Sequence, residues 1–221
     1  MKRFSFFLSA ILGMSILFGC TKEVEPSYEG KYVDLGLSVK WAQTNLGATK
    51  REDFGDYFAW GETTPKKEYS EENYKWYDKD GMLTKYCSDP TKGRVDDKVI
   101  LDPEDDAATV ILGADWRTPT LKECVELLEK CTWTWSSLGG IRGYMVTSNV
   151  PGYTDKYIFL PTGGSCVYDD PPVTNYQGAF WTSVNDSDNF RSHAFLTTII
   201  TTRTNSQDRW FGFNIRPVYN K

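Results

Sequence analysis

The chain has few residues that could do nucleophilic or acid–base chemistry, because it holds a single histidine, His193. A hydrolytic triad or a histidine-rich metal site would depend on that side chain. The motifs that accompany such sites, Gly-x-Ser-x-Gly, His-Glu-x-x-His and Cys-x-x-Cys, are absent from the sequence. Acidic residues are plentiful, and a pair of them could hydrolyse a glycosidic bond, but no motif nominates such a pair. We therefore expect a structural or surface histidine and no catalytic centre.

Two acidic runs offer oxygen ligands of the kind that a hard cation such as Ca²⁺ prefers. The run Asp-Pro-Glu-Asp-Asp at 102–106 is better explained as a helix start, with Asp102 as N-cap and Pro103 in the first turn. The run Val-Asn-Asp-Ser-Asp-Asn at 184–189 predicts a turn between two strands. Calcium binding at the second run is the alternative. The prediction is a chain with no metal site and no cofactor.

An aromatic loop is the better candidate for ligand binding. Residues 65–98 lack regular periodicity, and loops of this length in compact domains are usually functional or disordered. Trp76 and Tyr77 stand among charged neighbours, where their rings could stack on the apolar face of a sugar or on a partner's side chain. The alternative is that both rings pack back onto the core.

The cysteines leave two interpretations open. Beyond Cys20 there are four, an even number that could form disulfides in an oxidising compartment. Cys124 and Cys131 lie about 10.5 Å apart along one predicted helix, too far for a mutual bridge. Either could reach Cys87 or Cys166, or both could remain buried free thiols.

Residues 1–19 have the pattern of a lipoprotein signal peptide. A basic start is followed by an apolar run that ends in Leu-Phe-Gly-Cys at 17–20. The run is shorter than the roughly 20 residues that a helix needs to span a bilayer. Cleavage before Cys20 would make its sulfur the site of lipid attachment, and two or three acyl chains anchor firmly. The alternative is an ordinary secretory signal with an accidental cysteine.

We expect residues 20–31 to be the lipidated cysteine and a polar tether, and residues 32–221 to be one domain. The residues at 21–25 resemble the export signal of Bacteroidetes lipoproteins, which implies the outer membrane and its outer face. The formal net charge of −5, together with the absence of any Lys/Arg-rich run, makes nucleic acid an improbable class of partner.

The elements that position these residues are organised around Trp-Arg-Thr-Pro-Thr at 116–120. Thr120 and Glu123 form a capping-box pattern, and apolar residues recur at helical spacing from Leu121 to Cys131. A second helix is predicted to begin at Pro103, to run through Ala107 to Leu112 and to end at Gly113. Alternation or apolar content predicts strands at 33–41, 57–60, 132–135, 143–148, 157–160, 180–184, 191–197 and 210–218. Two helices among antiparallel strands and many loops make an α+β fold.

Several of these motifs together resemble a known family. Trp-Arg-Thr-Pro-Thr-x-x-Glu is similar to a signature of C-type-lectin-like and sulfatase-modifying-factor-like domains. The segments at 33–42, 55–62, 131–133 and 215–218 resemble the major paralogous domain (FISUMP) of Fibrobacter and Bacteroidetes lipoproteins. The resemblance runs from about Val33 to Val218 and implies a C-type-lectin-like fold. The family itself has no agreed ligand or reaction.

Comparison with that superfamily argues against two of its activities. The cysteine pair with which sulfatase-modifying enzymes bind copper near the chain end is missing, since Cys166 is the last cysteine. The Glu-Pro-Asn or Gln-Pro-Asp loop of calcium-dependent lectins is missing as well. Arg117 and Arg216 are expected to brace the fold through hydrogen bonds to carbonyls or carboxylates.

The sequence therefore favours a non-catalytic recognition module of the cell envelope that binds a glycan or a protein. The expected binding surface combines residues 65–98 with the loops after Gly163 and Val184. A structural or adhesion component of a surface assembly is the first alternative, and a glycan-acting enzyme is the second.

Overall fold

The helix predicted after Trp-Arg-Thr-Pro-Thr is present as α2, Leu121–Lys130. The Thr120 hydroxyl accepts a hydrogen bond from Glu123 N at 3.3 Å, and the Glu123 carboxylate accepts one from Thr120 N at 2.8 Å. This capping box confirms the predicted start. Arg117 donates two hydrogen bonds to Glu123, at 2.8 and 2.5 Å, as expected of a brace. The helix ends before Cys131, which begins the next strand.

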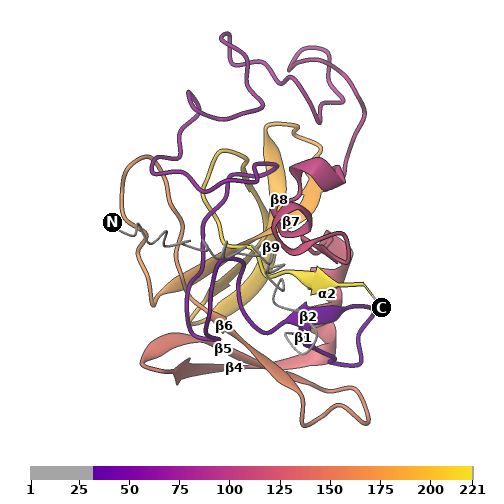
Figure 1. The fold of residues 1–221 in the computed structure, drawn as a ribbon, viewed down its shortest axis with the longest axis vertical. Helices are drawn as coiled ribbons and strands as arrows, with labels where there is room; N and C mark the ends of the chain where they lie inside the picture. Colours follow the sequence, from indigo (N-terminus) through magenta and orange to yellow (C-terminus); the bar gives the residue numbers. More distant parts are fainter. Residues whose placement is uncertain (1–31, 221) are drawn as a thin grey trace, which may run out of the picture.

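The structure is a computed structural model that describes residues 32–220. The predicted signal peptide, Cys20 and the tether lie outside the described residues. Within them, strands dominate, and they form three antiparallel sheets beside two α-helices, an α+β arrangement as predicted. Figure 1 shows the loop at 65–98, in purple, at one end of the molecule and the sheet formed by residues 131–161 at the other.

A four-stranded sheet joins the two ends of the described chain, in the order β1-β2-β10-β3. Its strands are β1 (Tyr32–Val33), β2 (Lys40–Ala42), β3 (Trp116–Arg117) and β10 (Val218–Tyr219). The single strand predicted over 33–41 is wrong. The Asp34 side chain accepts a hydrogen bond from Gly36 N, and Gly36 has φ +73°, so the chain bends between β1 and β2. The apolar side chains at every second position, Leu35, Leu37, Val39 and Trp41, are nevertheless buried.

Two three-stranded antiparallel sheets complete the fold. One has the order β4-β5-β6 and the other β7-β8-β9. Their strands are β4 (Cys131–Leu138), β5 (Ile141–Ser148), β6 (Tyr157–Pro161), β7 (Gln177–Asn185), β8 (Arg191–Thr198) and β9 (Thr201–Asp208). The strands predicted at 132–135, 143–148, 157–160, 180–184 and 191–197 are confirmed. Strand β9 was not predicted, because its polar sequence has no apolar alternation.

Two other predicted strands are wrong. Residues 57–60 contribute only an isolated bridge between Phe58 and Phe213. Residues 210–218 form isolated bridges until β10 begins at Val218. Both segments are rich in aromatic side chains because they pack in the core, so their composition indicated burial rather than a sheet ladder.

Helix α1, Ala107–Leu112, follows a 3₁₀ turn, η1, at Pro103–Asp105. Asp102 takes the N-cap position of η1 with Pro103 in the first turn, as predicted, but its side chain makes no capping hydrogen bond and the turn does not continue into α1. Asp106 caps α1 instead. Its carboxylate accepts hydrogen bonds from the backbone of Ala108 and Thr109, and from the backbone and hydroxyl of Thr118. Burial raises the pKa of the Asp106 carboxyl, and these hydrogen bonds oppose that shift.

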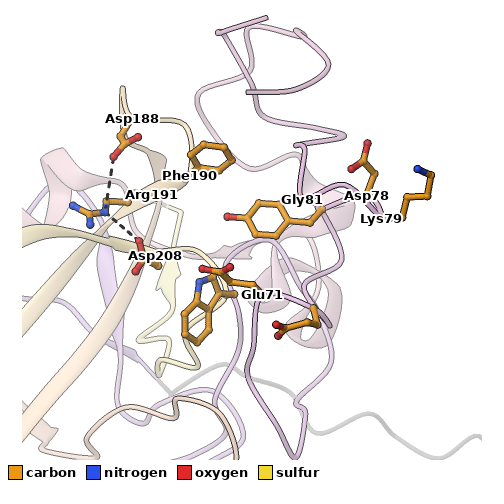
Figure 2. Close-up of a pocket in the computed structure, with 11 residues that line it drawn as sticks. Glu71, Asp78, Lys79, Gly81, Asp188, Phe190, Arg191 and Asp208 are labelled. Atoms are coloured by element: carbon orange, nitrogen blue, oxygen red, sulfur yellow. Dashed lines mark hydrogen bonds and ion pairs between the residues drawn. The ribbon is translucent and has the colours of Figure 1, made fainter. Parts of the chain in front are cut away.

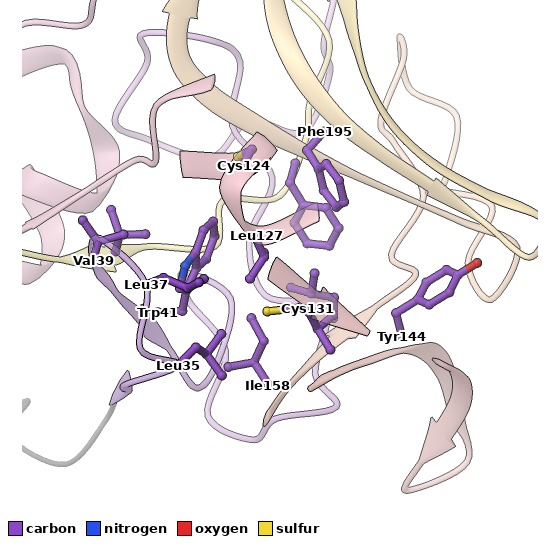
Figure 3. Packing of buried hydrophobic residues seen from close by; sticks show 14 residues of the cluster. Leu35, Leu37, Val39, Trp41, Cys124, Leu127, Cys131, Tyr144, Ile158 and Phe195 are labelled. Carbon is purple, nitrogen blue, oxygen red and sulfur yellow. The ribbon is translucent and has the colours of Figure 1, made fainter. Parts of the chain in front are cut away.

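The main core cluster surrounds the apolar face of α2. Figure 3 shows Cys124 and Leu127 of α2 among side chains from the segment between β1 and β2 and from the sheets. The cluster includes Leu35, Leu37, Val39, Trp41, Tyr144, Ile158 and Phe195. Cys124 and Cys131 are buried, and all four cysteines among the described residues are free thiols. The open choice between disulfides and free thiols is thereby settled for this structure.

Arg216 lies fully inside the fold and forms no ion pair with a carboxylate of residues 32–220. Its guanidinium donates hydrogen bonds to Asn45 Oδ1 at 2.8 Å, to Ala42 O at 3.0 Å and to Phe159 O at 2.8 Å. It thus ties the last segment of the chain to the loop after β2 and to β6, which confirms its predicted bracing role. Among the described residues, no helix is long and apolar enough to cross a membrane.

Candidate functional site

The long loop (residues 65–98) is held against the turn between β7 and β8 by side-chain hydrogen bonds. Asn189 Oδ1 accepts a bond from Ser88 N at 2.6 Å. The Asn185 amide donates to Tyr86 O at 3.4 Å and to Lys98 O at 3.1 Å. The loop therefore packs onto the domain, as its aromatic content predicted, and the turn at 184–189 is one of its supports.

Arg209 also connects the long loop to the segment that follows the β7–β8 turn. It is fully buried, and both of its terminal nitrogens donate to Tyr86 O at 3.1 Å while Nε donates to Arg191 O at 3.2 Å. Its guanidinium lies 4.7 Å from the ring centroid of Trp60, a cation–π contact. One cation thus connects the long loop to the first residue of β8.

Trp76 packs inward rather than presenting its ring to a ligand. Its indole N–H donates to Gly61 O at 3.0 Å, and its ring meets Tyr86 edge to face at 5.6 Å. The ammonium groups of Lys75 and Lys85 lie 4.2 and 5.3 Å from its ring centroid. For Trp76 the structure favours the alternative of core packing.

Tyr77, by contrast, lines a surface cleft of about 630 Å³. We refer to it as the aromatic cleft. Figure 2 shows how its two walls, the long loop and the ends of β8 and β9, face each other. The lining residues are Glu71, Glu72, Tyr77, Asp78, Lys79, Gly81, Asp188, Phe190, Arg191, Asp208 and Trp210. The rings of Tyr77 and Phe190 meet edge to face at 5.9 Å, so two of its three aromatic residues touch across the walls. The volume is typical of a small-molecule site.

The basic side chains of the aromatic cleft are already engaged. Arg191 Nε lies 3.1 Å from Asp208 Oδ1 and 3.9 Å from Asp188 Oδ2. Both contacts are marked in Figure 2, and the first follows from the β8–β9 register, which pairs Arg191 with Asp208. Lys79 is bound to its neighbour Asp80 at 2.8 Å. Five acidic and two basic residues line the cleft, so its surface is acidic.

The Tyr77 hydroxyl lies close to the cleft's acidic groups. Its pKa is raised to about 12, first by burial and then by the negative charge of Glu71, with smaller contributions from Asp208 and Asp188. The hydroxyl therefore stays protonated at neutral pH and can donate a hydrogen bond. The carboxylates of Glu71 and Glu72 form no ion pair or side-chain hydrogen bond within residues 32–220, so they are available to a ligand.

Sequence reasoning found only part of this site. Tyr77 and the loop after Val184 were predicted, and that loop supplies Asp188 and Phe190. The loop after Gly163 does not line the cleft, although its Tyr168 packs against Trp210 with ring centroids 5.3 Å apart. Asp208 and Trp210 were missed, because nothing in their local sequence separates them from core and strand residues.

The other candidate groups have structural partners. His193 is half-buried, and its Nε2 lies 3.6 Å from Asp186 Oδ2. Asp186 also accepts a hydrogen bond from Asp188 N at 2.8 Å and one from the Ser206 hydroxyl. The turn predicted at 184–189 is thus stabilised by its own side chains.

The acidic run at 102–106 is neutralised by lysines. Asp102, Glu104 and Asp105 bring carboxylate oxygens within 4.8 Å of one another. Lys85 Nζ lies 2.5 Å from Asp102, 3.8 Å from Glu104 and 2.6 Å from Asp105. This ammonium occupies the position that a cation would take, so the acids serve as an ion-pair network.

No family model, no curated protein and no solved structure matches this chain. The aromatic cleft and its chemistry are therefore the basis for a functional assignment.

Proposed function

We propose that this chain is a non-catalytic recognition module, and that the aromatic cleft binds a glycan. The observation that carries the proposal is the cleft itself, in which the half-buried rings of Tyr77 and Phe190 meet from two walls. Aromatic rings pack against the apolar faces of sugar rings, and carboxylates accept hydrogen bonds from sugar hydroxyls. The protonated Tyr77 hydroxyl adds a donor.

We also propose that the module is lipid-anchored at the outer membrane through Cys20 and has a C-type-lectin-like fold of the FISUMP type. The lipobox at 17–20 supports the anchor. The ordered series of motifs between Val33 and Val218 and the α+β content of the described residues support the fold. The ligand would then be a glycan at the cell surface.

The ion pairs of Asp188 and Asp208 argue against these two carboxylates as a catalytic pair. Glycosidases place two carboxyl groups on either side of the scissile bond. Asp208 instead pairs with Arg191 at 3.1 Å. Asp188 pairs with Lys92 at 2.8 Å and lies 3.9 Å from Arg191. These two groups therefore shape the wall of a site, and we assign them no catalytic role.

Replacement of Phe190 by alanine is expected to weaken glycan binding by roughly 3- to 10-fold, because one stacking surface is lost. The full chain, purified in mild detergent, would be screened on a glycan array. A hit would then be titrated by following tryptophan fluorescence, since Trp210 lines the cleft. Binding is expected to persist in a calcium chelator.

The matched control for this experiment is Tyr176→Ala, which removes an exposed aromatic ring outside the cleft and should leave affinity unchanged. Equal affinities for wild-type protein and Phe190→Ala would place the glycan elsewhere on the surface. Absence of any glycan hit would argue against the proposed function.

A specific observation favours assembly as a second candidate function. The tip of the β8–β9 hairpin exposes two adjacent isoleucines, Ile199 at 56% and Ile200 at 89%. Exposed apolar side chains of this kind are typical of contact surfaces. If the chain assembles, replacing both by serine is expected to convert an oligomer to a monomer, as measured by light scattering of the full chain in detergent. An unchanged mass would exclude the hairpin tip as the contact.

A further inference from the structure

We propose that the aromatic cleft selects glycans that carry protonated amino groups over neutral and acidic glycans of the same length. This inference rests on the proposed function, that the cleft binds a glycan, and adds the class of sugar. It follows from the charges that remain in the cleft once its internal ion pairs are counted.

The positive charges that line the cleft are already neutralised. Arg191 pairs with Asp208 at 3.1 Å and lies 3.9 Å from Asp188, whose closer partner is Lys92 at 2.8 Å. Lys79 is paired with Asp80, which is not a lining residue. An acidic sugar would therefore have to break an ion pair to find a cation. Its carboxylate would also approach the remaining acids, and like charges at short range repel.

The negative charges are only partly neutralised. Glu71 and Glu72 are exposed on the long-loop wall, and neither carboxylate has an ion-pair partner among residues 32–220. Asp78 accepts hydrogen bonds from Asp80 N and Met82 N, each at 2.9 Å, which lowers its pKa and keeps it ionised. Three carboxylates on one wall thus offer charge-assisted hydrogen bonds to an ammonium group.

The aromatic residues reinforce this preference. Tyr77 and Phe190 are half-buried and line the cleft, whereas Trp210 is buried and packs on Phe211. A cation near an aromatic face is attracted by the ring quadrupole. Lys92 already uses Phe190 in this way, with its ammonium 5.3 Å from the ring centroid. A sugar amine would meet aromatic faces and carboxylates together, whereas a neutral sugar would use only stacking and hydroxyl contacts.

A basic peptide could also supply amino groups to the cleft. The hydrogen bonding of the long-loop wall favours an amino sugar over such a peptide. Peptides gain much of their affinity by adding main-chain hydrogen bonds to a free strand edge. On the long-loop wall, main-chain groups of the turn at 78–82 are already used, since Asp78 N donates to Met82 O at 2.9 Å and Gly81 N donates to Asp78 O at 3.0 Å. The wall offers side chains to a ligand rather than an open edge.

The test compares three tetrasaccharides on the full chain in mild detergent at low ionic strength. They are β-1,4-linked glucosamine with its amines protonated, the fully N-acetylated form of the same tetramer, and a galacturonic acid tetramer. Isothermal titration is expected to show that the amine form binds at least about 10-fold more tightly than the acetylated form, with the acidic tetramer weakest. The advantage should shrink as salt is added.

The double variant Glu71→Gln/Glu72→Gln is expected to bring the amine-to-acetyl affinity ratio close to one. Glu129→Gln, an exposed glutamate on α2 far from the cleft lining, is the matched control and should keep the wild-type ratio. Equal binding of all three tetramers would overturn the preference and leave the proposed function intact. Failure of every tetramer would count against the proposed function as well. A lysine tetrapeptide that binds as tightly as the glucosamine tetramer would overturn the assignment to sugars.

Discussion

Replacement of Arg216 by methionine is expected to lower the free energy of unfolding by about 3–5 kcal/mol. Two effects oppose each other. Methionine removes the cost of keeping a cation away from water, a cost that also lowers the pKa of Arg216. It also leaves the oxygens of Asn45, Ala42 and Phe159 without their donor in the interior. The second effect should dominate, because three buried acceptors lose their hydrogen bonds at once.

Urea denaturation would measure this change. The matched control is Arg203→Met, at an exposed position on β9, for which the free energy of unfolding should change by no more than about 0.5 kcal/mol. Arg216→Lys should fall between the two, since an ammonium cannot reproduce the planar fork of a guanidinium. If Arg216→Met were as stable as the wild type, water or a rearranged side chain would have to satisfy the three oxygens.

The second large effect is expected from Arg209→Met, which should destabilise the protein by about 2–4 kcal/mol and reduce glycan affinity at least about 10-fold. Arg209 donates to Tyr86 O on one wall of the aromatic cleft and to Arg191 O on the other. Its loss should release the long loop from the sheet before the rest of the domain unfolds. Both the packing on Trp60 and the alignment of Tyr77 with Phe190 would be affected.

Hydrogen exchange would distinguish local release from global unfolding. Amides of the long loop, such as that of Leu83, should lose protection in Arg209→Met under conditions where amides of β5 keep theirs. Arg94→Met, at an exposed position in the same loop, is the control and should leave both exchange and binding unchanged. Uniform loss of protection over the loop and β5 would contradict a role for Arg209 specific to the cleft.

Much of the scaffold could be predicted, because its signals are local. The capping box of Thr120 and Glu123 is a pattern of four residues, and it is present. Strands with alternating burial, such as β5 and β8, were also found from short windows. The bracing role of Arg216 was inferred from a motif, although its three acceptors lie far away in the sequence.

The aromatic cleft could not be assembled in the same way, because its walls are joined by contacts between distant residues. The ring of Tyr77 contacts that of Phe190, and no sequence pattern in either segment predicts this contact. Trp76 and Tyr77 looked equivalent in the sequence, yet one donates its N–H to Gly61 O in the interior and the other lines the cleft. The strand expected over 33–41 failed for a different reason. Its burial alternates, but Asp34 and Gly36 bend the backbone.

The order of strands in the four-stranded sheet also bears on how the protein is made. Strand β10, which lies between β2 and β3, is the last strand along the described chain. Neither of its neighbours can pair with it until the chain has been synthesised as far as Tyr219. Contacts of such long sequence separation slow folding. If the chain is exported through a membrane, this sheet can be completed only after β10 has crossed, whereas the two three-stranded sheets are built from consecutive strands and do not depend on it.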